Sequence, residues 1–194
     1  MSVTPQAAPT ETPRTVDNYW NWASLIIALV GVAGSLWLSI AMNLWACALC
    51  FYQRAFIMGV ASILAVGLLA KVRTPGLLSI LSLPLAIAGL LIASFHVNLE
   101  RTNVLECPAG VLGWGTAPSQ SLCVYLVLTI VLCVDLVSSK ALQISLLPTG
   151  GAVLVGVLAA IGCLKSNPPP KIATTPDQVL NECRKPYVEP GKNP

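Results

Sequence analysis

The residues best suited to chemistry in this sequence are its cysteines, and two of them, Cys47 and Cys50, form a C-x-x-C motif. The motif stands at the start of a long apolar run, where the first turn of a helix leaves free backbone N–H groups and partial positive charge. Both features favour the thiolate, the reactive form of cysteine. The motif therefore predicts a redox-active dithiol beside the lipid. Alternatively, the two cysteines could supply two of the ligands of a site for a soft metal ion.

An arginine follows the motif inside the same apolar run. If a helix begins near Cys47, then Cys47, Cys50 and Arg54 share one face, because they are spaced i, i+3, i+7. A charge within a membrane span is costly and is a functional hypothesis by default. Arg54 could stabilise a thiolate or bind a quinone oxygen, and the alternative is a side chain that snorkels to the headgroups.

The elements that must position these residues are membrane helices. Of the 194 residues, 55% are hydrophobic and only 10% are charged, against about 25% charged in a soluble domain. The mean hydropathy is +0.75. This composition excludes an ordinary soluble domain and indicates a protein of the lipid bilayer. It offers no basic patch of the kind that binds nucleic acid.

Four apolar segments reach the roughly 20 residues that a membrane helix needs. They are residues 22–45, 51–70, 77–95 and 144–164. The sequence therefore predicts an all-α membrane protein, a bundle of four transmembrane helices over residues 22–164. A polar N-terminal tail, residues 1–21, precedes it, and a flexible C-terminal tail, residues 165–194, follows it.

A fifth apolar run, residues 122–137, is harder to place. It is shorter than a usual span and ends around Asp135. It could lie in the interface as a helix within a long outer loop, residues 96–143, or cross the membrane as a further span. Its length favours the interfacial helix.

Basic residues predict the orientation, because they are enriched on the cytoplasmic side. With four spans, one side holds five of them and the other side two. The five are Arg14, Lys71, Arg73, Lys165 and Lys171, and the two are Arg101 and Lys140. Both termini are therefore expected in the cytoplasm, with the C-x-x-C motif and the loop 96–143 outside, where disulfides persist. Cys163, inside the last span, and Cys183, in the tail, are expected to be spectators.

The run Cys47-Ala48-Leu49-Cys50-Phe51-Tyr52-Gln53-Arg54 resembles the C-x-L-C-x-x-Q-R signature of the DsbB/BdbC family of membrane disulfide bond formation proteins. The sequence LQISLLP, residues 142–148, is similar to the proline-containing start of that family's last span. The resemblance extends over about residues 22–164. This chain departs from the family at Ala46, where a proline is common, and in the apolar stretch 124–132 of the loop.

The resemblance implies a second cysteine pair in the outer loop. It matches Cys107 and Cys133 to that pair and makes all four cysteines catalytic, with Cys47 and Cys50 as the inner pair. Cys123 is the competing partner of Cys107 if residues 122–137 span the membrane.

The resemblance also implies a quinone site, of the ubiquinone or menaquinone type, formed by Gln53, Arg54 and His96. His96 is the only histidine of the chain and stands at the outer end of the third predicted span. A histidine there can donate a hydrogen bond or relay a proton near neutral pH. Its alternative role is an interfacial polar cap. No metal site is expected.

The function that the resemblance implies is that of a multi-pass thiol–disulfide oxidoreductase of the bacterial inner membrane. It would reoxidise a periplasmic DsbA-like thioredoxin-fold protein and pass the electrons to a membrane quinone. One alternative is an enzyme like vitamin K epoxide reductase, against which the Gln53-Arg54 pair argues. Another is a non-enzymatic metal-binding or assembly subunit. The single histidine and the lack of acidic residues in the four spans disfavour it.

Overall fold

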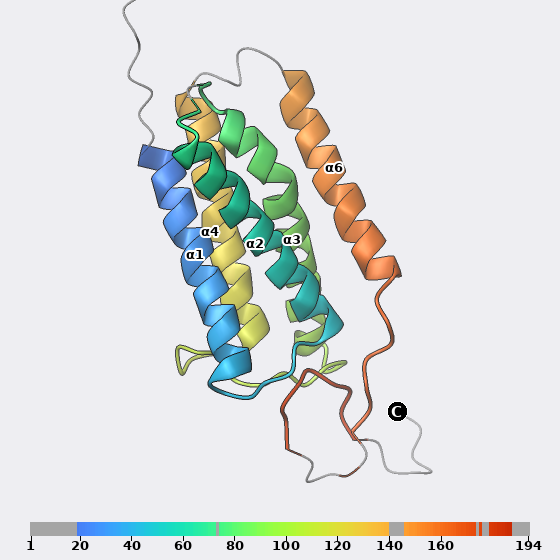
Figure 1. The fold of residues 1–194 in the computed structure, drawn as a ribbon. Coiled ribbons are helices and arrows are strands. Elements are labelled where there is room, and N and C mark those ends of the chain that lie inside the picture. Colours follow the sequence, from blue (N-terminus) through green and yellow to red (C-terminus); the bar gives the residue numbers. More distant parts are fainter. Residues whose placement is uncertain (1–18, 73, 140–145, 174, 176–178, 188–194) are drawn as a thin grey trace, which may run out of the picture.

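The computed structural model describes residues 19–72, 74–139, 146–173, 175 and 179–187, and the side chains of residues 146 and 147 are left out of the description. Over these ranges the chain forms five α-helices. They are α1, Tyr19–Ile40; α2, Ala48–Leu69; α3, Leu77–Arg101; α4, Ala117–Ser138; and α6, Leu146–Lys165 (Figure 1). Most of the predicted N-terminal tail, the first four residues of the LQISLLP segment, and Arg14, Arg73 and Lys140 lie outside the described residues.

All five of the described helices are long and apolar enough to cross a membrane, so the protein is a multi-pass membrane protein. The prediction of four spans is therefore wrong. The short apolar run 122–137 is the body of α4, which begins five residues earlier, after a capping box formed by Thr116 and Ser119. A polar first turn belongs to this helix, and counting apolar residues alone misses it. Asp135 at its far end is buried and accepts a hydrogen bond of 2.6 Å from Ser79 of α3.

Five antiparallel crossings place the start of α1 and the end of α6 at opposite ends of the bundle (Figure 1). The expectation that both tails lie on the same side of the membrane depended on four spans, and five spans do not support it. With five helices, Lys165 and Lys171 lie at the opposite end of the bundle from the one predicted with four. The unequal distribution of basic residues therefore no longer decides the orientation. The end at which α2 begins and α6 ends is called the cysteine end below.

Helices α1 to α4 enclose the main core, and α6 packs against α3 along the edge of the bundle (Figure 1). Buried aliphatic side chains fill the core, among them Val60, Leu64, Leu83, Leu128 and Leu132. A Cβ at Gly156 would press on the backbone of Pro84, so a glycine is required for the close approach of α6 to α3. This packing fixes the positions of α2, α3 and α4 relative to one another at the cysteine end.

The described residues after α6, which are 166–173, 175 and 179–187, are called the C-terminal segment. Two backbone hydrogen bonds pair Glu106 with Arg184 in an isolated antiparallel bridge, with N–O distances of 2.8 and 3.1 Å. A third, of 2.8 Å, runs from the Trp45 N–H to the Asn181 carbonyl. The segment thus contacts both the α1–α2 and the α3–α4 loop.

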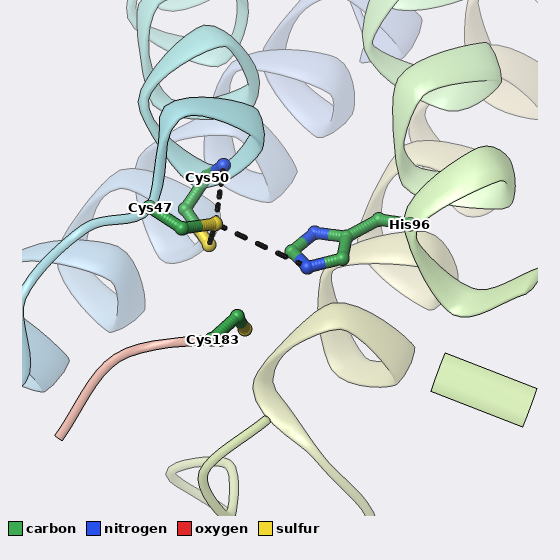
Figure 2. A group of neighbouring side chains, drawn as sticks. All are labelled: Cys47, Cys50, His96 and Cys183. Atoms are coloured by element: carbon green, nitrogen blue, oxygen red, sulfur yellow. Dashed lines mark hydrogen bonds between the residues drawn. The ribbon is translucent and has the colours of Figure 1, made fainter. Parts of the chain in front are cut away.

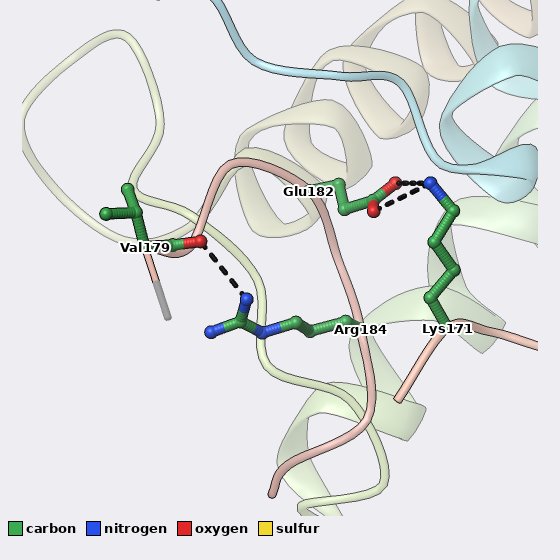
Figure 3. Close-up of polar contacts among 4 residues, drawn as sticks. All are labelled: Lys171, Val179, Glu182 and Arg184. Carbon is green, nitrogen blue, oxygen red and sulfur yellow. Dashed lines mark hydrogen bonds and ion pairs between the residues drawn. The ribbon is translucent and has the colours of Figure 1, made fainter. Parts of the chain in front are cut away.

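Side chains add to this anchorage. Lys171 and Glu182 form an ion pair of 2.9 Å, and Arg184 donates to the Val179 carbonyl at 3.1 Å (Figure 3). The Lys171 ammonium also lies 6.0 Å from the centroid of the Trp45 ring, within reach of a cation–π contact. The C-terminal segment is therefore folded across the cysteine end.

Candidate redox site

The C-x-x-C motif begins helix α2, as its position in the sequence predicted. Cys47 is the N-cap, and its Sγ accepts a hydrogen bond of 3.2 Å from the backbone N–H of Cys50. The two Sγ atoms lie 2.6 Å apart. The hydrogen bond from the Cys50 thiol lowers the pKa of Cys47 to about 5; His96 adds to this effect, and burial opposes it. Cys47 is therefore the thiolate of the pair at neutral pH.

Cys107 of the α3–α4 loop forms a disulfide with Cys183 of the C-terminal segment. Cys123 lies in the second turn of α4 and Cys133 lies in its second half, and both have exposed side chains and free thiols. Neither is joined to Cys107, so the predicted Cys107–Cys133 pairing and its Cys123 alternative are both corrected. The fifth crossing is the physical reason, because it delivers Cys183 to the cysteine end.

The two pairs meet around a buried histidine of α3. His96 has no exposed surface. Its Nε2 lies 3.4 Å from the Cys107 Sγ and 4.0 Å from the Cys47 Sγ. The Sγ atoms of Cys47, Cys50 and Cys183 and a ring nitrogen of His96 all lie within 4.8 Å of one another (Figure 2). This spacing allows thiol–disulfide exchange between the pairs after small side-chain rotations.

A hydrogen-bond chain from α4 orients this histidine. Ser121 donates to the Gln53 Oε1 at 2.7 Å, and the Gln53 Nε2 lies 3.4 Å from the His96 Nδ1. Because the amide oxygen is already used by Ser121, the NH₂ group faces Nδ1. In the neutral ring the proton then sits on Nε2, toward the sulfurs. Gln53 thus contacts the histidine as well as lining the cavity described below.

Arg54 reaches across to α1. Its Nε donates to the Ser35 Oγ at 2.8 Å, and its Nη2 donates to the Ser35 carbonyl at 2.9 Å and to the Ser39 Oγ at 2.6 Å. Among the residues that the structure describes, Nη1 makes no hydrogen bond. The expected direct contact with a cysteine thiolate is not formed, and the guanidinium is held in place by α1.

A cavity of about 530 Å³ opens beside the motif, between α1, α2, α4 and the loops of the cysteine end. Apolar side chains line most of it, including Trp37, Leu38 and Val124, and its polar lining includes Cys50, Gln53 and Arg54. This volume and lining are typical of sites for small apolar ligands. His96 does not line the cavity, so its predicted contact with a quinone finds no support in the geometry.

The sequence reading missed two kinds of residue at this site. Cys183 was expected to be a spectator at the end of the bundle opposite the C-x-x-C motif, and the fifth helix brings it to the cysteine end. Ser121, Ser35 and Ser39 carry no motif; their one signal is polarity within otherwise apolar helices.

Fold and site together define a multi-pass membrane protein with two adjoining cysteine pairs at one end and an apolar cavity that Cys50 and Cys183 both line. Residues 17–123 match the family model described as "Disulfide bond formation protein DsbB". This match extends over more than half of the chain, and the protein belongs to the DsbB family.

A curated relative, the "Probable disulfide formation protein" of Chlamydia caviae, is 32% identical over 85 residues. That alignment covers 44% of this chain and 58% of the relative. No solved structure matches the chain. The family match includes Cys47, Cys50, His96 and Cys107 but ends at residue 123, before the rest of α4, α6 and Cys183.

Proposed function

We propose that this protein is a protein-dithiol:quinone oxidoreductase that supports disulfide bond formation in the bacterial inner membrane. The observation that carries the proposal is the stacking of the Cys107–Cys183 disulfide against Cys47 and Cys50, with Cys50 opening on the apolar cavity. Electrons then have an entry at the loops and an exit beside the lipid.

The entry step is oxidation of a DsbA-like thioredoxin-fold partner. A partner thiolate attacks one sulfur of the Cys107–Cys183 disulfide, and a mixed disulfide forms. The second partner thiol resolves it, so the partner leaves as a disulfide and Cys107 and Cys183 remain as thiols. Both cysteines are at least nine-tenths buried, so the C-terminal segment has to shift for the partner to reach them.

The transfer step joins the two pairs. A thiolate of the reduced Cys107/Cys183 pair attacks the oxidised Cys47–Cys50 disulfide, and two electrons and two protons pass inward. The His96 Nε2–H points at these sulfurs, so it can stabilise the attacking thiolate by donating a hydrogen bond to it. The Cys47/Cys50 dithiol that results is the arrangement described above.

The exit step uses the cavity. A quinone accepts two electrons and two protons when bound, and the apolar lining and 530 Å³ volume fit its ring. Arg54, prearranged by Ser35 and Ser39, would hold a carbonyl oxygen through Nη1. Cys50 lines the same cavity, so its sulfur would be the electron donor to a quinone bound there.

The orientation of the protein follows from redox chemistry. A disulfide persists in an oxidising compartment, so the cysteine end is assigned to the periplasm and the start of α1 to the cytoplasm. A cysteine introduced at Thr175 should react with an impermeant maleimide in intact cells, whereas one at Lys71 should not. The reverse labelling would overturn this orientation.

The function is tested by following the reduction of a soluble quinone by the purified chain, with a reduced thioredoxin-fold protein as the electron donor. Cys50→Ser should abolish the reaction, because the pair next to the cavity can no longer be oxidised. Cys133→Ser, which changes an exposed free cysteine in the second half of α4, is the matched control and should keep the wild-type rate. Quinone reduction that survives in Cys50→Ser would refute the proposed function.

A further inference from the structure

The cysteine end gathers a set of soft ligand atoms that disulfide exchange alone does not require. Three sulfurs, from Cys47, Cys50 and Cys183, and an imidazole nitrogen of His96 lie within 4.8 Å of one another (Figure 2). In a tetrahedral zinc site the bonds are about 2.3 Å to sulfur and about 2.0 Å to nitrogen, which sets neighbouring ligand atoms roughly 3.5–3.8 Å apart. To reach that geometry the Cys47 and Cys50 sulfurs, 2.6 Å apart, would have to separate by about 1 Å, and the more distant ligand atoms would have to approach.

Cys183 can join such a site only when its disulfide with Cys107 is reduced. Reduction does not free the segment that carries it. The hydrogen bond from Trp45 to Asn181 precedes Cys183 and the pair between Glu106 and Arg184 follows it, and neither involves a sulfur. The Cys183 thiol therefore stays beside the other ligands.

The histidine can present a lone pair to a cation without losing its support. Metal-bound imidazoles donate their second N–H to a neighbouring oxygen. If the Gln53 amide turns over, its Oε1 faces the His96 Nδ1–H and its NH₂ faces Ser121. The Ser121 hydroxyl can accept as well as donate, so the hydrogen-bond chain from α4 survives with its direction reversed.

We propose that the reduced protein binds a soft divalent cation of the zinc type through Cys47, Cys50, Cys183 and His96. Reduction of Cys107–Cys183 by a dithiol or a phosphine adds two electrons and two protons to the sulfurs. Cation binding then releases the protons of the thiols that become ligands. If the proposed function holds, the cation occupies three of the four sulfurs that carry electrons and arrests the relay in its fully reduced state.

The test uses Cd²⁺ as the probe, because cadmium thiolates absorb in the ultraviolet. The full chain, in detergent and with Cys123, Cys133 and Cys163 changed to serine, is reduced with a phosphine and freed of reductant under argon. The reduced chain should bind about one equivalent of Cd²⁺ in a tetrahedral site, and the chain with both pairs oxidised should bind none. Binding by the oxidised chain, or no binding by the reduced one, would overturn the proposal.

Two further variants form a matched pair, since Cys107→Ser and Cys183→Ser each abolish the same disulfide and differ only in the thiol that remains. Cys107→Ser should bind Cd²⁺ like the reduced host chain. Cys183→Ser and His96→Ala should bind it roughly tenfold more weakly, or worse. Equal affinities in the matched pair, or the opposite order, would remove Cys183 from the site and refute the assignment.

The cation site and the proposed function fail separately. Cd²⁺ binding is measured without quinone, and quinone reduction is measured in the presence of a chelator. If the chain does not reduce quinone but Cys107→Ser still binds Cd²⁺ more tightly than Cys183→Ser, the cation site stands and the proposed function is refuted. If the chain reduces quinone but its reduced form binds no Cd²⁺, the proposed function stands and the cation site is refuted.

Discussion

The two cysteine pairs of the cysteine end are brought together by different means. Cys47 and Cys50 meet because a single helix turn begins between them. Cys107 and Cys183 are 76 residues apart in the chain, with α4 and α6 between them. The first pair depends on one helix start, and the second depends on the topology of the whole bundle.

This difference suits different reaction partners. The helix-start pair is held by packed helices beside a preformed cavity, which fits a small rigid ligand. The remote pair is carried by two irregular segments joined by a few backbone hydrogen bonds. Such segments open at lower free-energy cost than packed helices, as docking of a protein partner requires. The following predictions test this division.

The largest expected effect concerns the identity of the remote pair. Cys183→Ser should slow oxidation of a protein dithiol by roughly 100-fold or more, because the entry disulfide cannot form. A small dithiol such as dithiothreitol should still drive quinone reduction through Cys47 and Cys50. Cys133→Ser is the control and should leave both rates unchanged. If instead Cys133→Ser is inactive and Cys183→Ser is active, the remote pair has been misassigned.

The next effect concerns the cavity side. Arg54→Lys keeps the charge but loses the planar fork that Ser35 and Ser39 hold. The apparent KM for quinone should rise about tenfold, equivalent to about 1.4 kcal/mol, with little change in the rate of partner oxidation in a single turnover. An unchanged KM would show that Arg54 does not bind quinone and serves only to join α2 to α1 through Ser35 and Ser39.

A pH profile separates the two thiols of the helix-start pair. Because the pKa of Cys47 is lowered to about 5, its alkylation in the reduced protein should be nearly constant from neutral pH down to that value. It should slow tenfold per pH unit below it, as the thiolate is protonated. His96→Ala should move the midpoint upward, toward the ordinary thiol value. A midpoint near 9 in the wild-type chain would contradict the thiolate assignment.

The smallest expected effect lies in the hydrogen-bond chain from α4. Ser121→Ala removes the donor that orients the Gln53 amide and should slow exchange between the two pairs about two- to threefold. The Cys47 alkylation midpoint should shift in the same direction as in His96→Ala, but less. Thr129→Ala, which removes another hydroxyl of α4, should shift neither. Equal behaviour of the two variants would assign Ser121 to helix packing alone.

Much of the helix-start region could be predicted from local sequence. The spacing of Cys47, Cys50 and Arg54 predicted a helix start with an intramembrane charge, and α2 begins at Ala48 with Cys47 as its cap. The other three predicted spans also correspond to helices, with ends shifted by a few residues. These features depend on hydropathy and on hydrogen bonds within one turn, which neighbouring residues determine.

The partner of Cys107 could not be predicted in this way. The polar first turn of α4 and its buried Asp135 made a spanning helix look like a loop. One miscounted crossing moves every later residue to the other side of the membrane. Cys183 thereby changed from a cytoplasmic spectator to the partner of Cys107.

The sequence by itself determined the membrane class, the reactive C-x-x-C motif and the membrane helix that carries it, because apolar length and helix capping are local properties. Only the tertiary structure decided which sulfurs face each other, where Arg54 is held and which way His96 points. Those depend on the number of crossings and on contacts between α1, α2, α4 and the C-terminal segment, which lie far apart in the chain. A disulfide between distant residues records the topology of the fold, and no local pattern encodes that topology.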